Sequence, residues 1–172
     1  MVRIIGCILM ITGCTAIGFW RAECMRRRLQ EMQELKRYVL FMKGEICCRN
    51  RTLPETLLEL EKKAKGIWKK FFHNTGRSLE KMEEGTLAEI WKKEMTRQLS
   101  GSYLKEREKK EWLTLGENLG YLDMEMQLHM LEIFQVHLSE SMEEEREEVK
   151  SQSKLSRILG VMSGIFLTVL LI

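Results

Sequence analysis

The sequence predicts an all-α membrane protein, in which N- and C-terminal transmembrane helices flank a cytoplasmic bundle of about six helices. The chain has one proline in 172 residues and is 31% charged, a composition that favours helices over β sandwiches or barrels. Uncharged stretches cover residues 4–20 and 158–172. Between them, apolar side chains recur at spacings of three and four, as amphipathic helices require.

The first uncharged stretch is predicted to be a membrane span within a transmembrane segment of residues 1–21. As a helix, residues 4–20 would extend about 25 Å, close to the thickness of the hydrocarbon layer. Residues 11–14 (ITGC) also have the composition of a lipoprotein cleavage box, which would put a lipid on Cys14. The membrane span is the favoured interpretation, because the apolar run continues past Cys14 and the basic cluster lies on the wrong side for export.

The helix of the first span is predicted to continue to about residue 47, since neither glycine nor proline separates the two. Its apolar positions repeat by threes and fours, which gives one buried face. They are Met25, Leu29, Met32, Leu35, Val39, Met42 and Ile46.

Four shorter helices are predicted to follow. Capping boxes of the form T-x-x-E occur at Thr52–Glu55 and Thr86–Glu89, and each opens a helix. Gly66 and Gly85 separate segments, and Gly120 stands where a helix end prefers glycine. The predicted ranges are 52–65, 67–83, 86–99 and 103–119.

The last helix is predicted to be very long, with Asp123 as its N-cap. Its near-heptad apolar pattern has no breaker before Gly160, so it passes into a second span over residues 158–172. Basic residues cluster just after the first span and just before the second. The positive-inside rule therefore places the middle, residues 22–157, in the cytoplasm.

The two long helices must then run antiparallel, with facing positions whose numbers sum to about 177. This pairing sets Arg26, Arg27 and Arg28 near the acidic block of residues 143–148. In energetic terms we interpret both runs as mainly solvated faces, in which each ion pair contributes about 0.2–1 kcal/mol.

Both predicted spans carry small side chains one helical turn apart. Gly160 and Gly164 form a G-x-x-x-G motif, and Cys14 and Gly18 are spaced in the same way. Small faces let membrane helices approach closely. The first candidate contact is therefore between the two spans themselves.

The sequence favours neither an enzyme nor a cofactor or metal protein. It has no glycine-rich phosphate loop, no G-x-S-x-G and no H-E-x-x-H. Five cysteines without a C-x-x-C pair indicate neither a disulfide framework nor a zinc site. Residues 21–157 hold 27 of the 28 basic residues, all but Arg3, against 25 acidic ones. Nucleic acid is therefore not expected as a partner.

Several motifs together resemble one family. An apolar N-terminal run contains Gly6 and ends in TAIGF at 15–19, and Glu45-Ile46 precede TLPE at 52–55. LGENLG at 115–120 is followed by Asp123, Gln127 and His129, and SRILGVMSG at 156–164 opens the apolar tail. These motifs resemble stage III sporulation protein AB over nearly the whole chain. The most specific is LGENLGYLD with the Q-x-H that follows it.

The chain also departs from the family pattern in two places. Residues 26–28 are all basic where the family usually has Arg-Pro. Residues 47–55 read CCRNRTLPE where Tyr-Gly-x-Thr-Pro-Leu is usual. We therefore expect the turn after the first cytoplasmic helix to differ in detail.

The resemblance implies a non-enzymatic inner-membrane platform subunit of the complex that links mother cell and forespore. The family is similar to the cytoplasmic module of type II secretion and type IV pilus platform proteins, so the implied partners are a secretion-type ATPase, other membrane subunits and membrane lipid. The implied location is the mother-cell side of the membrane around the forespore. The oligomeric state is left open. The alternative is a membrane-tethered helical hairpin with a regulatory or scaffolding role unrelated to secretion.

The candidate site is the LGENLG corner. Gly116 and Gly120 would allow close helix approach and a sharp turn, and Glu117 and Asp123 would cap a helix or meet basic groups of a partner. A purely intramolecular helix corner is the competing interpretation for each of the four residues.

Overall fold

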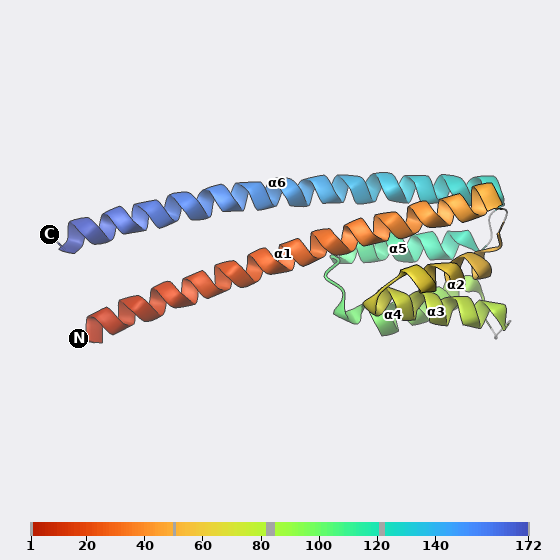
Figure 1. Ribbon diagram of the computed structural model, residues 1–172, viewed down its shortest axis with the longest axis horizontal. Helices are drawn as coiled ribbons and strands as arrows, with labels where there is room; N and C mark the ends of the chain where they lie inside the picture. Colours follow the sequence, from red (N-terminus) through yellow and green to blue (C-terminus); the bar gives the residue numbers. More distant parts are fainter. Residues whose placement is uncertain (1, 50, 82–84, 121–122, 172) are drawn as a thin grey trace. The chain divides into compact units, whose positions relative to one another are not determined.

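The chain is helical over most of its length in the computed structural model. The backbone is described for residues 2–49, 51–81, 85–120 and 123–171, and the side chains for 20–49, 51–81, 85–120 and 123–151. The described residues form six α-helices, one 3-10 helix and no strand, which confirms the all-α prediction (Figure 1). The helices are α1 (Val2–Arg49), α2 (Leu53–Lys63), α3 (Gly66–Glu80), α4 (Leu87–Gln98), η1 (Leu99–Gly101), α5 (Glu106–Leu119) and α6 (Met124–Leu171).

The chain divides into two compact units. Unit 1 comprises residues 1–29 and 141–172, and unit 2 comprises residues 30–140. The helices α1 and α6 each contribute to both units, whereas α2 to α5 belong to unit 2 alone. The boundaries predicted at residues 21 and 158 concern the membrane and remain predictions.

The side chains of the two predicted spans lie almost wholly outside the described part of the structure. The same holds for the predicted packing residues Cys14, Gly18, Gly160 and Gly164. The backbone at these four positions is helical. Where side chains are described, no helical stretch has the length and apolarity needed to cross a membrane.

The helix starts follow the predicted caps, with one exception. In both T-x-x-E boxes the threonine N–H donates to the glutamate, over 3.0 Å at Thr52–Glu55 and at Thr86–Glu89. Helix α5 begins at Glu106 rather than at the predicted residue 103. The Lys105 N–H donates to Glu108 Oε2 over 2.8 Å, which caps the helix at this point, and the Tyr103 N–H donates to Glu31 Oε2 over 2.7 Å, which ties the preceding segment to α1.

An aromatic cluster forms the core of unit 2. Trp91 meets Phe71 edge to face and packs at a tilt against Trp112, with ring centroids 5.0 and 4.9 Å apart, and its Nε1 donates to the Trp112 carbonyl over 3.0 Å. Tyr38 of α1 and Phe134 of α6 join the same cluster. Phe71, Trp91 and Trp112 are each 0% exposed. Burial of this size supplies much of the favourable free energy of folding.

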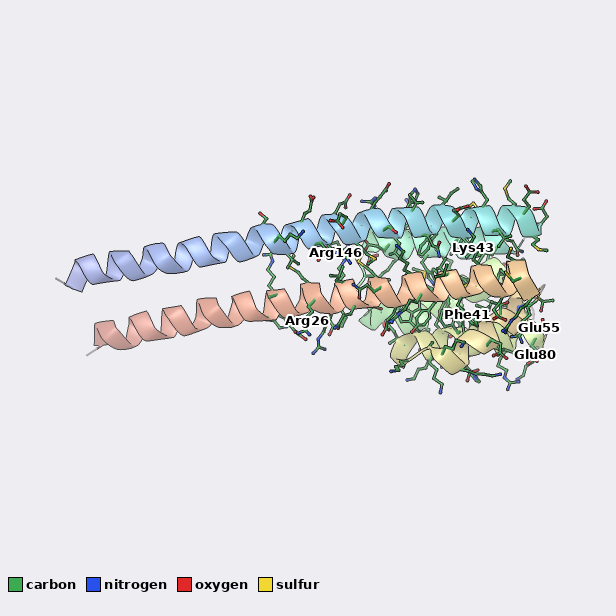
Figure 2. The ribbon with its side chains drawn as sticks, turned by 45° about the horizontal axis from the view of Figure 1, so that its top comes forward. Arg26, Phe41, Lys43, Glu55, Glu80 and Arg146 are labelled. Atoms are coloured by element: carbon green, nitrogen blue, oxygen red, sulfur yellow. The ribbon has the colours of Figure 1, made fainter. Side chains whose placement is uncertain are left out.

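Within unit 2, α1 and α6 run antiparallel. Lys36 Nζ donates to Ser139 Oγ over 2.8 Å, and Lys43 pairs with Glu132 over 3.3 Å. Both pairs of residue numbers sum to 175, close to the predicted 177. Figure 2 labels Lys43 and Phe41 on α1. The Nζ of Lys63, in α2, lies over the Phe41 ring, 4.9 Å from the ring centroid.

Unit 1 contains a buried ion pair between its two helices. Arg28 pairs with Glu145, and the two residues are 6% and 2% exposed. This confirms the predicted approach of residues 26–28 to the acidic block. The interpretation as mainly solvated faces is wrong at this pair, although it fits Arg27, which is exposed and pairs with Glu23 on its own helix.

Burial raises the pKa of the Tyr38 phenol above its ordinary value of 10.0. Because the unfolded tyrosine then ionises first, this stabilisation is complete below about pH 10 and is lost as the pH rises through the folded pKa. We expect Tyr38→Phe to reduce the fall in the free energy of unfolding between about pH 9 and about pH 11. Guanidinium titrations at both pH values would measure it, and an unchanged slope would contradict it.

Candidate functional site

The predicted site residues lie at the corner where α5 ends and α6 begins. The Asp123 side chain accepts the Met126 N–H over 2.9 Å, so it caps α6 as predicted. Gln127 of α6 donates from Nε2 to the carbonyl of Leu119, the last residue of α5, over 2.9 Å. The corner is therefore closed by hydrogen bonds from within the chain.

The two glycines of the corner make room for α4. A Cβ on Gly116 would lie 2.3 Å from two ring atoms of Trp91, and one on Gly120 would lie 3.0 Å from the Leu87 Cβ. Gly120 has φ −78°, a right-handed helical value that any residue adopts. The Cβ distances fit the predicted close approach at both glycines, and α5 ends at Gly120 as predicted, although this φ does not itself require glycine.

The acidic residues of the corner face solvent. Glu117 and Asp123 are exposed, and so are Met124 and Met126, at 44% and 49%. Met124 also borders a small groove of about 250 Å³. Its lining residues are Ile46, Arg51, Thr52, Leu53, Met124 and Gln127. Of the four predicted residues, Glu117 is the one whose side chain has no role in the packing described above.

Comparison with known proteins decides the family. The model of the family described as stage III sporulation protein AB matches residues 3–172. The chain belongs to the stage III sporulation protein AB family. A role in sporulation follows from this membership. A solved structure of "Stage III sporulation protein AB (SpoIIIAB)" is similar at a TM-score of 0.65 and 18% identity, covering 72% of this chain and 97% of that one. A comparison with curated proteins finds no match.

This member of the stage III sporulation protein AB family also has a buried carboxylate that pattern reading did not single out. Glu31 accepts hydrogen bonds from Trp68 Nε1 over 3.2 Å, from Ser102 Oγ over 2.8 Å and from the Tyr103 N–H. It therefore joins α1 to α3 and to the segment before α5. A signal was present, because charged residues 28, 31 and 45 keep three- and four-residue spacing with buried Leu35, Tyr38 and Met42.

Proposed function

We propose that the chain is a non-enzymatic platform subunit of a secretion-like sporulation complex that links mother cell and forespore. It presents unit 2 to a secretion-type ATPase and to other membrane subunits. The main support is that α1 and α6 are each 48 residues long. Each helix includes one of the two apolar terminal stretches and also contributes to unit 2. Each helix would extend about 70 Å. Family membership supports the sporulation part of the proposal.

The proposed location is the mother-cell side of the membrane around the forespore, with unit 2 in the cytoplasm. Exposed Arg21, Arg26 and Arg27 follow the first apolar stretch, as the positive-inside rule expects of a cytoplasmic flank. Intact-mass measurement of the extracted protein would test this topology. Loss of residues 1–13 with an added lipid would contradict it.

The proposed contact surface for the ATPase is the α5–α6 corner. Exposed Glu117 and Asp123 offer carboxylates to basic groups, and the flexible side chains of Met124 and Met126 offer adaptable apolar contact. Both glycines are used in internal packing, so a partner would meet the acidic and methionine side chains.

Charge reversal at Glu117 tests this surface. We expect Glu117→Lys to reduce both spore yield and recovery of the ATPase with the protein from sporulating cells by about tenfold, because it places a cation against basic groups. Glu140→Lys is the matched control, since Glu140 is also an exposed glutamate within a helix. If Glu117→Lys folds normally and leaves sporulation and ATPase recovery intact, the corner is only structural.

The alternative is a membrane-tethered hairpin with a scaffolding or regulatory role unrelated to secretion. The antiparallel contacts between α1 and α6 support it, because they are the contacts that a helical hairpin requires. Gene order distinguishes the two proposals. A secretion-type ATPase encoded immediately upstream, with small membrane proteins downstream, supports the platform.

A further inference from the structure

Unit 2 has a second, larger groove, of about 670 Å³, between α2, α3 and the end of α4, which we call the α3–α4 groove. It carries three permanent cations and one carboxylate. The lining residues are Glu61, Lys69, Lys70, His73, Asn74, Arg97 and Gln98. The whole chain has a net charge of only +3, so this groove is a local concentration of positive charge.

The cations of the α3–α4 groove are largely uncompensated. The side chains of Lys69 and Lys70 are exposed and form no hydrogen bond or ion pair with any residue in the described part of the chain. The side chain of Arg97 is 69% exposed, and its Nη1 is 3.9 Å from Glu94 Oε1, at the limit of an ion pair. Exposed charges of one sign on a concave wall raise the local potential and attract the opposite charge.

A neighbouring groove shows that this imbalance is not general. It has a similar volume, about 600 Å³, and its lining contains four basic and four acidic residues: Arg49, Arg51, Lys62, Arg77, Glu55, Glu59, Glu61 and Glu80. Its charges pair with one another, as in Lys62–Glu59 over 2.7 Å and Arg77–Glu80 over 3.1 Å. Figure 2 shows Glu55 and Glu80 close together on this side of unit 2.

Two amides give the α3–α4 groove a second property. Asn74 Nδ2 and Gln98 Nε2 donate to buried Glu94 over 2.6 and 3.3 Å. A carboxylate only accepts hydrogen bonds, so the NH₂ groups must face Glu94, and each amide oxygen remains as an acceptor on a groove-lining residue. Such acceptors match backbone N–H groups. They do not match a phosphate, which presents acceptors itself.

We propose that the α3–α4 groove binds an acidic segment of a partner protein. Carboxylates of the segment meet Lys69, Lys70 and Arg97, and its backbone N–H groups meet the free amide oxygens of Asn74 and Gln98. The concave shape fits a chain segment better than a planar lipid surface. The inference does not depend on the secretion role, because it requires only residues of α2, α3 and α4.

The test uses the full chain in a nonionic detergent and a fluorescent decapeptide of glutamate as the probe, followed by anisotropy. We expect Lys69→Gln/Lys70→Gln to weaken binding about tenfold, and Arg77→Gln/Lys81→Gln to weaken it less than about twofold. Both pairs remove two positive charges from or beside α3, but Arg77 lines the charge-balanced groove and pairs with Glu80, whereas Lys69 and Lys70 line the α3–α4 groove. A decapeptide of glutamine should not bind, and added salt should weaken binding of the glutamate peptide.

Several results would overturn the inference. Equal weakening by both variant pairs means that net charge alone attracts the probe. Complete displacement of the peptide by inorganic phosphate at equal concentration identifies an anion site instead. If phosphatidylglycerol vesicles protect Lys69 and Lys70 from acetylation more strongly than the peptide does, the groove is a lipid-binding surface. Peptide binding can persist when the ATPase experiment fails, so the two proposals fall separately.

Discussion

Gly116→Ala is expected to lower the free energy of unfolding by about 2–3 kcal/mol, as overpacking of a closed core does. The new methyl group would lie 2.3–2.4 Å from three ring atoms of Trp91. The indole cannot easily yield, because it is fully buried, hydrogen-bonded through Nε1 and surrounded by Phe71 and Trp112. Helices α4 and α5 would have to separate.

Gly44→Ala is the matched control. Gly44 is an exposed glycine inside α1, and nothing lies within 4 Å of a Cβ placed there. The same substitution should therefore raise stability by about 0.5–1 kcal/mol, through the better helix propensity of alanine. Guanidinium unfolding of the full chain in detergent, followed by the fluorescence of the buried tryptophans, measures both. Equal effects of the two variants would show that Gly116 is not required for packing.

Glu145→Gln is expected to destabilise the contact between α1 and α6 in unit 1 by about 3–5 kcal/mol, the usual cost of removing one member of a buried ion pair. Arg28 and Glu145 are both buried, so water cannot solvate the arginine that remains. The double variant Arg28→Met/Glu145→Leu should recover most of the loss, because apolar side chains of similar size need no counter-charge.

Hydrogen exchange of amides in residues 22–30 and 141–150 measures this effect locally. Arg27→Gln serves as the control, since the Arg27–Glu23 pair is exposed and solvent screens its attraction. Faster exchange in Glu145→Gln than in Arg27→Gln is the expected result. Equal exchange, or a double variant worse than the single one, would mean that the pair does not hold the two helices together.

Much of the fold could be predicted from local signals. The boxes at Thr52 and Thr86 and the N-cap Asp123 act within one helical turn, so they mark helix starts independently of tertiary structure. The register of α1 and α6 followed from the antiparallel order of two long helices. The start of α5 was predicted three residues early, because Glu108 caps it at Lys105, where no Ser, Thr, Asp or Asn marks the N-cap.

The candidate site was predicted in place but only partly in role. The sequence singled out Gly116, yet the reason for a glycine lies in Trp91, 25 positions away, and in the packing of α5 on α4. The buried Arg28–Glu145 pair was located by register, but its burial depends on how the two helices pack. The α3–α4 groove was not predicted, because α3 and α4 bring Arg97 near Lys69 and Lys70 only in the folded chain.

The three hydrogen bonds to Glu31 give unit 2 a mechanical property. Rotation or sliding of this part of α1 along its axis would pull on Trp68 in the aromatic core and on Ser102 and Tyr103 ahead of α5. Because these bonds are buried or partly buried, water does not readily replace them. Torque applied to α1 near Glu31 is therefore transmitted to the core of unit 2.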